Sequence, residues 1–413
     1  MRLAILGTRG VPAAYGGFET LAEELSARLA ARGHDVTVYA RRGAVREAVS
    51  RWRGVRVVFA PTFRHKYLDT VVHGVTSGLH AAVASYDAVL VCNGANALAC
   101  RLPRLLGAGT RVLLNVDGLE RNRRKWNRLG KAVYALSERL SCVLPDVVVT
   151  DAEEIRRYYR ERYGAESAFV PYGSDLPEPE DATVLGSLGL EPERYLLYVS
   201  RFEPENNPDA VVRAYRDVPG ELPLLLVGSA PYAEGFIARL KEEAARDPRV
   251  VLPGAIYGEG YRALLANTAA YVHATEVGGT HPALIEAMGY GRPVLVHDTP
   301  ENREVAGEAA LLWDARDPAT LTGLLERLLP DAARRNALGA AARRRAEARY
   351  RWDDVTTAYE KLLGEGPPPG LPALRHALPR PAPLHEYGAG DDAHGRWLRS
   401  AAWRRAAGAG ATV

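Results

Sequence analysis

The chain has 413 residues, enough for two domains with complete hydrophobic cores, and its hydrophobic and charged fractions are those of an ordinary globular protein. Its formal net charge of +3 is too small to indicate a nucleic-acid-binding protein. The three cysteines (Cys92, Cys100 and Cys142) show no metal or redox spacing, and no apolar run approaches the roughly 20 residues that span a bilayer. We therefore expect a cytoplasmic protein without a signal segment, whose contact with a membrane is at most peripheral.

The first half of the sequence predicts alternating strands and helices. A strand in RLAILGT is followed by a Gly/Pro loop and by an amphipathic helix that begins near Phe18 and ends at Gly33. Further buried strands are predicted in DVTVYA, VRVVFAP, DAVLVC, RVLLNV and DVVVT. Because their Val/Leu runs are continuous rather than alternating, we expect a parallel sheet with both faces covered by helices.

The same pattern restarts after a Pro-rich, acidic linker. Strands are predicted in RYLLYVS, PLLLVGS, RVVLPG, AAYVHAT and PVLVHD, and helices then continue to about Gly364. The predicted fold class is therefore α/β, with two Rossmann-like domains (1–175 and 176–365) that face each other across a cleft. The Pro/Gly/Arg-rich residues 366–413 are predicted to form a disordered tail.

One segment of the second half predicts an anion-binding site. The strand in TAAYVHAT is followed by Gly278 and Gly279, and a helix begins at Thr280 or His281 with a proline in its first turn. Free backbone N–H groups and the positive end of the helix dipole would meet there, so that a diphosphate would be stabilised. Glu286 lies on the same helix, where its carboxylate would reach groups attached to that diphosphate.

This strand, glycine loop and helix resemble the nucleotide-sugar site of family 4 glycosyltransferases, which have the GT-B fold. The resemblance covers residues 1–365 and implies that the last helix, in WDDVTTAYEKLL, crosses back to the first domain. It implies that a sugar moves from a nucleoside diphosphate to a hydroxyl group with retention at the anomeric carbon. It also implies that the nucleotide sugar is a co-substrate and that neither a further cofactor nor a metal is required. The absence of a D-x-D motif agrees with this expectation.

The opening segment carries a second glycine loop, in YGGFETLAEEL. In the family this loop approaches the donor's diphosphate, so the resemblance assigns Gly16 and Gly17 to donor binding. The alternative is a purely structural turn, because glycine often only relieves backbone strain. A dinucleotide-binding Rossmann site is disfavoured, because the loop lacks G-x-G-x-x-G and the second strand ends in Tyr39-Ala40-Arg41 without a ribose-binding acid.

The segment VSRFEPENNPD resembles the part of the family that neutralises the leaving diphosphate with an Arg and, five residues later, a Lys. Arg201 matches the Arg, whereas Asn206 stands where the Lys is expected. A neutral amide stabilises negative charge much less than an ammonium group does. The alternative for Arg201 is an ion pair with Glu203 or Glu205, and we favour phosphate binding because Arg201 follows a buried strand at a cleft edge.

The E-x7-E signature of the family is only half present. Glu286 matches the second Glu, which implies contact with the ribose hydroxyls, but Gly278 occupies the position of the first. Two readings stay open. Either the loop bulges so that Glu276 serves as a catalytic residue, or the backbone amides from Gly278 to His281 hold the sugar, with His281 as a donor to a phosphate.

Six motifs resemble one sub-branch of the family. They are GTRG, YGGFET, VDGLE, ENN, GGT and NREVAG, and that sub-branch includes rhamnosyltransferases of bacterial capsule and cell-wall polysaccharide assembly. The resemblance therefore implies dTDP-rhamnose as the donor, with a UDP-sugar as the alternative. It also implies that the two departures from the family signatures are traits of the sub-branch.

Acceptor binding is predicted near RVLLNVDGLERNRRKW. Asp117 follows a buried strand and is expected to orient the acceptor hydroxyl or to accept its proton, although a helix-cap or turn role is nearly equal. The basic cluster after it is predicted to bind the pyrophosphate of a polyprenyl-linked glycan acceptor or the inner face of the plasma membrane. A solvated helix face is the open alternative. The cluster comprises Arg123, Arg124, Lys125 and Trp126, and we expect Arg64, His65 and Lys66 to extend it.

Two other functional classes remain open at this point. A GT-B nucleotide-sugar epimerase has no acceptor, and the basic cluster argues against it. A catalytically silent nucleotide-sugar-binding protein is suggested by the missing Lys and the missing first Glu. Donor binding without turnover on any acceptor would favour the silent protein.

Overall fold

The computed structural model describes residues 1–13, 16–45, 48–63, 69–105, 109–123, 126–175, 183–230 and 233–365. The predicted tail (366–413) and the predicted residues Arg64 to Lys66, Arg124 and Lys125 lie outside these ranges. Within the described part of the chain, every helix is too short or too polar to cross a lipid bilayer.

A first domain is built around an eight-stranded sheet with the order β3-β4-β2-β1-β5-β6-β7-β8. All neighbouring strands are parallel except β3 and β4. The central strands consist of fully buried Val and Leu residues, as expected for a sheet covered on both faces. The strands are β1 (Arg2–Leu6), β2 (Asp35–Ala40), β3 (Arg51–Trp52), β4 (Val55–Phe59), β5 (Ala88–Cys92), β6 (Arg111–Asn115), β7 (Val147–Thr150) and β8 (Ala168–Phe169).

The helices of this domain bury one face against the sheet. In α1, Leu21, Leu25 and Leu29 recur every fourth residue and are all buried, whereas the opposite face is polar. The described helices of the domain are α1 (Gly17–Ala31), α2 (Asp69–Ala84), η1 (Gly94–Arg104), η2 (Glu120–Asn122), α3 (Arg128–Ser141) and α4 (Glu153–Tyr163).

A second domain is built around a six-stranded parallel sheet with the order β11-β10-β9-β12-β13-β14. Its strands are β9 (Leu196–Val199), β10 (Leu224–Val227), β11 (Val250–Gly254), β12 (Ala270–His273), β13 (Val294–His297) and β14 (Ala310–Trp313). Its helices are α5 (Thr183–Ser187), η3 (Pro204–Asn206), α6 (Pro208–Arg216), α7 (Glu234–Ala244), α8 (Gly258–Asn267), α9 (Pro282–Gly289), α10 (Pro300–Ala306), α11 (Ala319–Leu328) and α12 (Ala332–Arg349). The predicted α/β fold class with two Rossmann-like sheets is therefore confirmed.

Each sheet has a point at which the strand order reverses. In the first sheet β1 lies between β2 and β5, and in the second β9 lies between β10 and β12. Where the strand order reverses, the loops after two adjacent strands run to opposite faces of the sheet, and a crevice opens between them at the carboxyl ends of those strands. The glycine loop after β1 and the segments after β9 and β12 all begin at these crevices.

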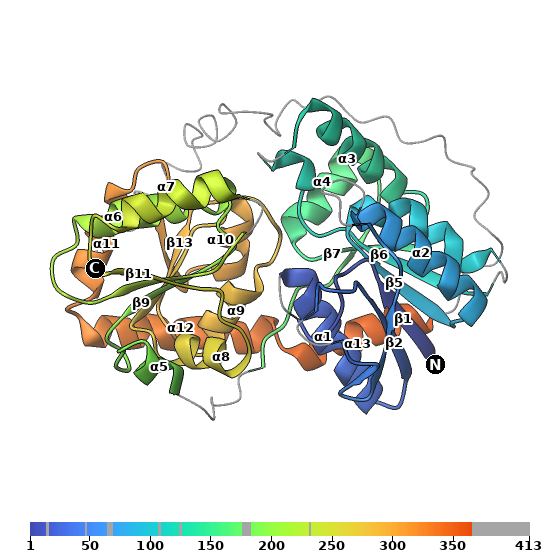
Figure 1. Ribbon diagram of the computed structural model, residues 1–413, viewed down its shortest axis with the longest axis horizontal. Coiled ribbons are helices and arrows are strands. Elements are labelled where there is room, and N and C mark those ends of the chain that lie inside the picture. Colours follow the sequence, from blue (N-terminus) through green and yellow to red (C-terminus); the bar gives the residue numbers. More distant parts are fainter. Residues whose placement is uncertain are drawn as a thin grey trace.

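The last described helix connects the two domains. Figure 1 shows α13 (Trp352–Gly364), drawn in red-orange, beside the blue α1 although the two are far apart in the sequence. It packs against α1, β5 and β6, and Asn115 of β6 donates a hydrogen bond of 2.7 Å to the hydroxyl of Tyr359. At its start, Trp352 covers Gly173, where a Cβ atom would lie 2.7 Å from the indole Cδ2. The end of the chain thus completes the core of the first domain.

Candidate active site

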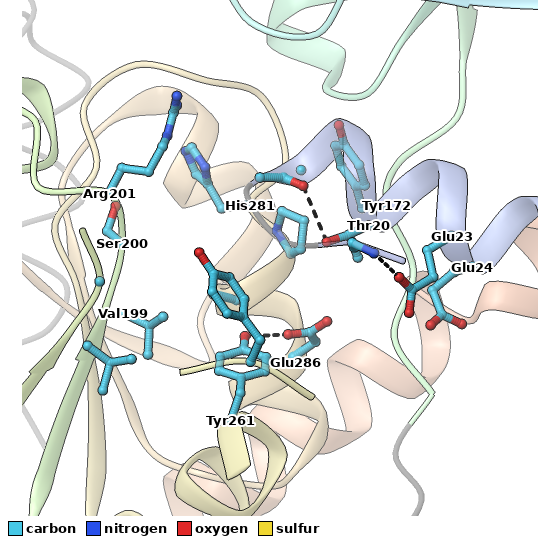
Figure 2. A pocket seen from close by; sticks show the side chains of 18 of the residues that line it. Thr20, Glu23, Glu24, Tyr172, Val199, Ser200, Arg201, Tyr261, His281 and Glu286 are labelled. Atoms are coloured by element: carbon cyan, nitrogen blue, oxygen red, sulfur yellow. Dashed lines mark hydrogen bonds between the residues drawn. The ribbon is translucent and has the colours of Figure 1, made fainter. Parts of the chain in front are cut away.

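A cleft of about 1130 Å³ lies between the two sheets, where the crevices of both meet. It is lined by the glycine loop and α1 of the first domain and by the segments after β9, β11 and β12 of the second. Figure 2 shows Arg201 and His281 on one side of the view and Glu23 and Glu24 of α1 on the other. The cleft therefore has a cationic end and an acidic end.

The loop between β12 and α9 forms the predicted anion site. His281 is the N-cap of α9 with an extended backbone, and Pro282 is the first helical residue. The imidazole of His281 folds over Gly278, because a Cβ atom there would lie 2.3 Å from its Cε1. This packing leaves no room for a side chain at the position of the first Glu of the family signature. His281, Pro282 and Ala283 at the start of α9 line the cleft, where the positive end of the helix dipole favours an anion.

Three side chains form the cationic end of the cleft: Arg123, Arg201 and His281. Arg201 follows β9, and its guanidinium Nη2 lies 3.5 Å from Oε2 of the buried Glu203. Burial, followed by the charges of Arg123 and Arg201, lowers the pKa of His281 to about 3. His281 is therefore neutral at physiological pH and offers one ring N–H, while the two arginines supply the charge that a diphosphate would meet.

Asn206 lines the cleft, and its side chain stabilises the loop that carries Arg201. Its side-chain Nδ2 donates a hydrogen bond to the main-chain carbonyl of Arg201 at 2.7 Å. The main-chain carbonyl of Asn206 accepts a hydrogen bond from the hydroxyl of Tyr198, also at 2.7 Å. The side chain is buried, so the amide fixes the course of the loop between β9 and α6. The residue that stands in place of the family Lys is thus a structural amide beside the cationic end.

Glu286 lies on the inner face of α9 and receives a hydrogen bond from the hydroxyl of Tyr261, drawn dashed in Figure 2. Burial raises the pKa of Glu286 from 4.5 to about 7, although the bond from Tyr261 opposes the shift. A carboxylate at this depth, one and a half turns from the helix N-terminus, is placed to accept hydrogen bonds from the hydroxyls of a ligand bound at that N-terminus.

The glycine loop of the first domain lies opposite α9. Gly16 is the N-cap of α1, and its carbonyl accepts the N–H groups of Glu19 and Thr20 at 3.1 Å. A Cβ atom on Gly17 would lie 3.2 Å from the hydroxyl of Tyr172 and 3.7 Å from Pro282 of the second domain. The glycine pair therefore lets the start of α1 approach α9 closely, which narrows the cleft at this point.

Asp117 lines the cleft from the carboxyl end of β6. Its φ of 53° is left-handed, which costs a non-glycine residue free energy, and the side chain of Asn115 accepts its N–H at 3.0 Å to hold it there. Burial raises the pKa of Asp117, the charge of Arg123 lowers it, and the carboxyl group of Asp151 lies nearby.

Two family models match consecutive parts of the chain. The model described as "Glycosyl transferase 4-like domain" matches residues 16–173, and the model described as "Glycosyl transferases group 1" matches residues 186–345. The chain is a glycosyltransferase of the GT-B fold.

Curated relatives of this glycosyltransferase include two mannosyltransferases. It is 28% identical to the O-antigen chain mannosyltransferase B of Escherichia coli over 43% of this chain and 49% of that protein, so it spans about half of that relative. It is also 28% identical to the GDP-mannose-dependent alpha-(1-6)-phosphatidylinositol monomannoside mannosyltransferase of Mycobacterium tuberculosis, over 88% of this chain and 98% of that protein.

Solved structures agree with the GT-B fold. Sucrose-phosphate synthase from Thermosynechococcus elongatus is 21% identical and superimposes with a TM-score of 0.75 over 87% of this chain and 98% of that one. The HepE protein of Anabaena in complex with UDP-glucose is 15% identical, with a TM-score of 0.69 over 88% of this chain and 99% of that one. At these identities the likeness shows the fold of the glycosyltransferase and not its substrates.

The structure corrects the expectation for Glu276. Thr275 and Val277 line the cleft, whereas Glu276 between them does not, because successive side chains of an extended segment point to opposite sides. The backbone N–H of Glu276 donates to the carbonyl of Glu205 at 2.8 Å, and its Oε1 lies 3.9 Å from Nε2 of His297. Glu276 is therefore directed away from the cleft and does not replace the missing first Glu.

The interpretation of the basic cluster as a membrane-facing surface is corrected for Arg123. Arg123 is only 6% exposed and lies in the cleft among three carboxylates, those of Glu120, Glu203 and Glu205. Trp126 is half-buried, with its ring centroid 4.9 Å from that of Tyr134 on α3. The burial of Arg123 cannot be predicted from the local sequence, because two of the three carboxylates that pair with it belong to the second domain.

Sequence reasoning missed one acid beside the site. Asp151 follows β7 in the first domain, and its Oδ2 accepts the backbone N–H of Thr280 in the second domain at 2.8 Å. The hydroxyl of Thr280 also donates a hydrogen bond to the main-chain carbonyl of Asp151. Asp151 therefore supports the loop through two hydrogen bonds. The position of Asp151 at the carboxyl end of a predicted strand was the available signal. Among the described residues, no group of three or more His, Cys, Asp or Glu side chains could hold a metal ion.

Proposed function

We propose that this glycosyltransferase binds a nucleoside-diphosphate hexose in the cleft and transfers the hexose, with retention, to a hydroxyl of a lipid-linked acceptor. One observation carries the proposal: a single cleft joins a helix N-terminus and two arginines to a partly buried carboxylate, Glu286. The first group suits a diphosphate and the second suits the hydroxyls of a ribose.

The proposed chemistry is mainly electrostatic. As the bond between the anomeric carbon and the phosphate oxygen breaks, negative charge grows on the diphosphate, and Arg201, Arg123 and the N-terminus of α9 stabilise it. The neutral His281 donates a hydrogen bond to a phosphate oxygen. The hydroxyl of the acceptor gives its proton to the leaving phosphate on the same face, and Asp117 orients that hydroxyl from the opposite wall.

Two donors are proposed in order. The relatives of Escherichia coli and Mycobacterium tuberculosis are both named as mannosyltransferases, and the second is named as GDP-mannose-dependent, which supports GDP-mannose as the first donor to test. dTDP-rhamnose, which rests on the motif resemblance alone, is the second. A UDP-sugar is the third, since HepE of Anabaena binds UDP-glucose.

The experiment that tests the proposal is thermal unfolding of the purified protein with GDP, UDP and dTDP and with their sugars. A nucleotide that binds at a concentration of 100 times its Kd stabilises the folded state by about 2.7 kcal/mol, which gives a measurable rise in Tm. Arg201→Ala and Glu286→Ala are each expected to lower this rise. If no nucleotide raises the Tm of the wild type, or if both variants keep the full rise, the proposed donor site is wrong.

A lipid-linked acceptor is supported by an apolar stripe on α3. Leu129, Val133 and Leu136 are 73%, 52% and 47% exposed, and their spacing of four and three residues places them on one helix face. The exposed Arg128 and Lys131 lie on the same helix. Apolar side chains beside cations suit the surface of an anionic membrane. The neighbouring α2 and η1 expose further apolar side chains (Leu79, Val83, Leu98 and Leu105).

Flotation with lipid vesicles tests this part of the proposal. The protein is expected to float with vesicles that contain phosphatidylglycerol and to float less with pure phosphatidylcholine. The double variant Leu129→Asp/Val133→Asp should lose flotation, whereas Ala333→Asp, at an exposed site on α12, should retain it. Unchanged flotation of the double variant would exclude the α3 stripe as the membrane contact.

A further inference from the structure

The GGT loop of the second domain lies directly on two segments of the first domain. A Cβ atom built on Gly118 would lie 2.5 Å from the Cα of Gly278, so the backbones touch where the VDG and GGT motifs cross. A Cβ atom on Gly279 would lie 2.1 Å from Oδ1 of Asp151, and the φ of Gly279 is not left-handed. Position 279 therefore excludes a side chain because a carboxyl group of the other domain fills the space, and not because the backbone requires glycine.

Asp151 fixes the path of this loop as well as filling space beside it. It is buried, and it binds Thr280 twice, through the carboxylate to the backbone N–H and through the main-chain carbonyl to the hydroxyl. Thr280 immediately precedes His281, the N-cap of α9. The two bonds therefore set the direction in which the chain enters the helix whose N-terminus faces the cleft.

The buried Asp151 also forms an acid pair with the partly exposed Asp117. Oδ1 of Asp151 has no hydrogen-bond partner among the described residues, and the carboxyl group of Asp117 lies near it. Burial first, and the Asp117 charge second, raise the pKa of Asp151 well above its usual range. Since two adjacent carboxyl groups do not both ionise where one of them is buried, we infer that they share a proton. The neutral Asp151 then donates to Asp117 and accepts from Thr280.

We propose that Asp151 is a positioning residue: from the first domain it holds the backbone of Gly278 to Thr280 in the geometry that receives the donor's diphosphate. This inference rests on the proposed donor site and deepens it. It also accounts for the departure from the family signature, because the acidic group near the loop comes from the opposite domain, through Asp117 and Asp151, instead of from position 278.

A pair of small substitutions and their combination test the proposal. Gly279→Ala places a methyl group against Asp151 and should lower nucleotide affinity by about tenfold or more, and Asp151→Ala should lower it by about tenfold. In the double variant the methyl group has room, so affinity should exceed that of Gly279→Ala alone. Affinities are measured by titration calorimetry with GDP, UDP and dTDP. Gly186→Ala, at a glycine with no neighbour within 4 Å of its built Cβ, is the matched control.

Asp151→Asn separates positioning from a general loss of packing. The amide oxygen of Asn accepts the Thr280 N–H, and its NH₂ group donates to Asp117, so Asn reproduces the neutral acid. The nucleotide affinity of Asp151→Asn should therefore lie within about threefold of the wild-type affinity, and circular dichroism should show that all variants are folded.

The positioning role is wrong if Asp151→Ala binds nucleotide as the wild type does, if Asp151→Asn binds no better than Asp151→Ala, or if the double variant binds no better than Gly279→Ala. If the wild type binds none of the three nucleotides, the proposed donor site itself fails and the positioning role falls with it. If the wild type binds and only the Asp151 and Gly279 series disagrees, the donor site stands and this inference alone is overturned.

Discussion

Glu286 is a cleft residue whose charge depends strongly on its surroundings. Burial raises its pKa from 4.5 to about 7, so at neutral pH the empty cleft holds a mixture of the neutral and ionised forms. An ionised carboxylate accepts two hydroxyl groups, whereas the neutral acid accepts fewer and keeps a proton of its own. The charge of Glu286 therefore links nucleotide binding to pH.

We expect nucleotide affinity to rise as the pH increases from 6 to 8, because binding favours the ionised form of Glu286. Stability without nucleotide should change in the opposite direction. A folded-state pKa above the unfolded value stabilises the protein at low pH, and that stabilisation is lost as the pH rises through about 7. Glu286→Gln should weaken nucleotide binding, flatten its pH profile and raise the free energy of unfolding at pH 8 by about 1–2 kcal/mol.

Titration calorimetry and chemical denaturation at pH 6, 7 and 8 measure both effects. Equal pH profiles for the wild type and Glu286→Gln would show that this carboxyl group does not titrate in the assigned range.

Arg123 is predicted to be essential for stability, contrary to its expected place on the surface. It is the cation at the centre of Glu120, Glu203 and Glu205, of which the last two are almost fully buried. Arg123→Ala would remove the cation beside the buried Glu205 and one of the two that face Glu203, and it should cost about 3–5 kcal/mol of unfolding free energy. Urea denaturation measures the loss.

Arg128→Ala provides the control for Arg123→Ala, because Arg128 is exposed at the start of α3 and its loss should change the free energy by less than about 0.5 kcal/mol. A similarly small effect of Arg123→Ala would contradict the ion cluster.

The sequence placed several cleft residues correctly and others wrongly for identifiable reasons. Arg201, His281 and Glu286 follow directly from a buried strand or from a helix start, so their local pattern was sufficient to bring them to the cleft. Glu276 and Arg123 were misplaced. The orientation of Glu276 depends on whether it points to one side of an extended segment or to the other. The orientation of Arg123 depends on carboxylates of the second domain. Neither can be predicted from a local sequence pattern.

At the scale of elements, α13 shows how a helix far along the chain supports an early domain. Its N-terminal Trp352 covers Gly173, and the guanidinium of Arg28 lies 5.5 Å from the centre of the indole ring. Beside it, the backbone N–H of Ser174 donates to the carbonyl of Tyr350 at 2.6 Å. The segment that leaves the first domain is therefore held by the segment that returns to it. The resemblance to the GT-B fold implies that this helix crosses back to the first domain, and the structure shows that it packs there against α1, β5 and β6.

Trp352→Ala is expected to cost about 3–5 kcal/mol, because the lost indole leaves a cavity between Gly173 and α1. Trp352→Phe keeps part of the packing and should cost less. Thermal unfolding followed by circular dichroism ranks the variants, with the wild type most stable and the Ala variant least. An Ala variant as stable as the Phe variant would show that the returning helix does not depend on this side chain.

In the whole molecule, two acidic side chains connect the domains, and each accepts hydrogen bonds from the backbone of the other domain. Asp151 of the first domain binds the backbone ahead of α9, and Glu304 of the second domain binds the first turn of α4, where it accepts the N–H groups of Glu153 and Glu154 at 2.8 and 3.0 Å. Glu304 satisfies two backbone donors that the start of α4 leaves open, and Asp151 satisfies the N–H of Thr280 ahead of α9. Both contacts join the two domains, so they stabilise the arrangement that the structure shows.

Glu304→Ala should therefore shift the protein without nucleotide toward an open cleft and give a larger radius of gyration in small-angle X-ray scattering. Nucleotide affinity should fall by about tenfold, or about 1.4 kcal/mol, because closure must then be driven by the ligand alone. Saturating nucleotide should restore the smaller radius. Glu166→Ala, at an exposed acid of the same domain as α4, should change neither quantity. A Glu304→Ala protein with the wild-type radius and wild-type affinity would mean that the contact with α4 does not contribute to closure, and that the interface is held by the GGT loop and its acid pair alone.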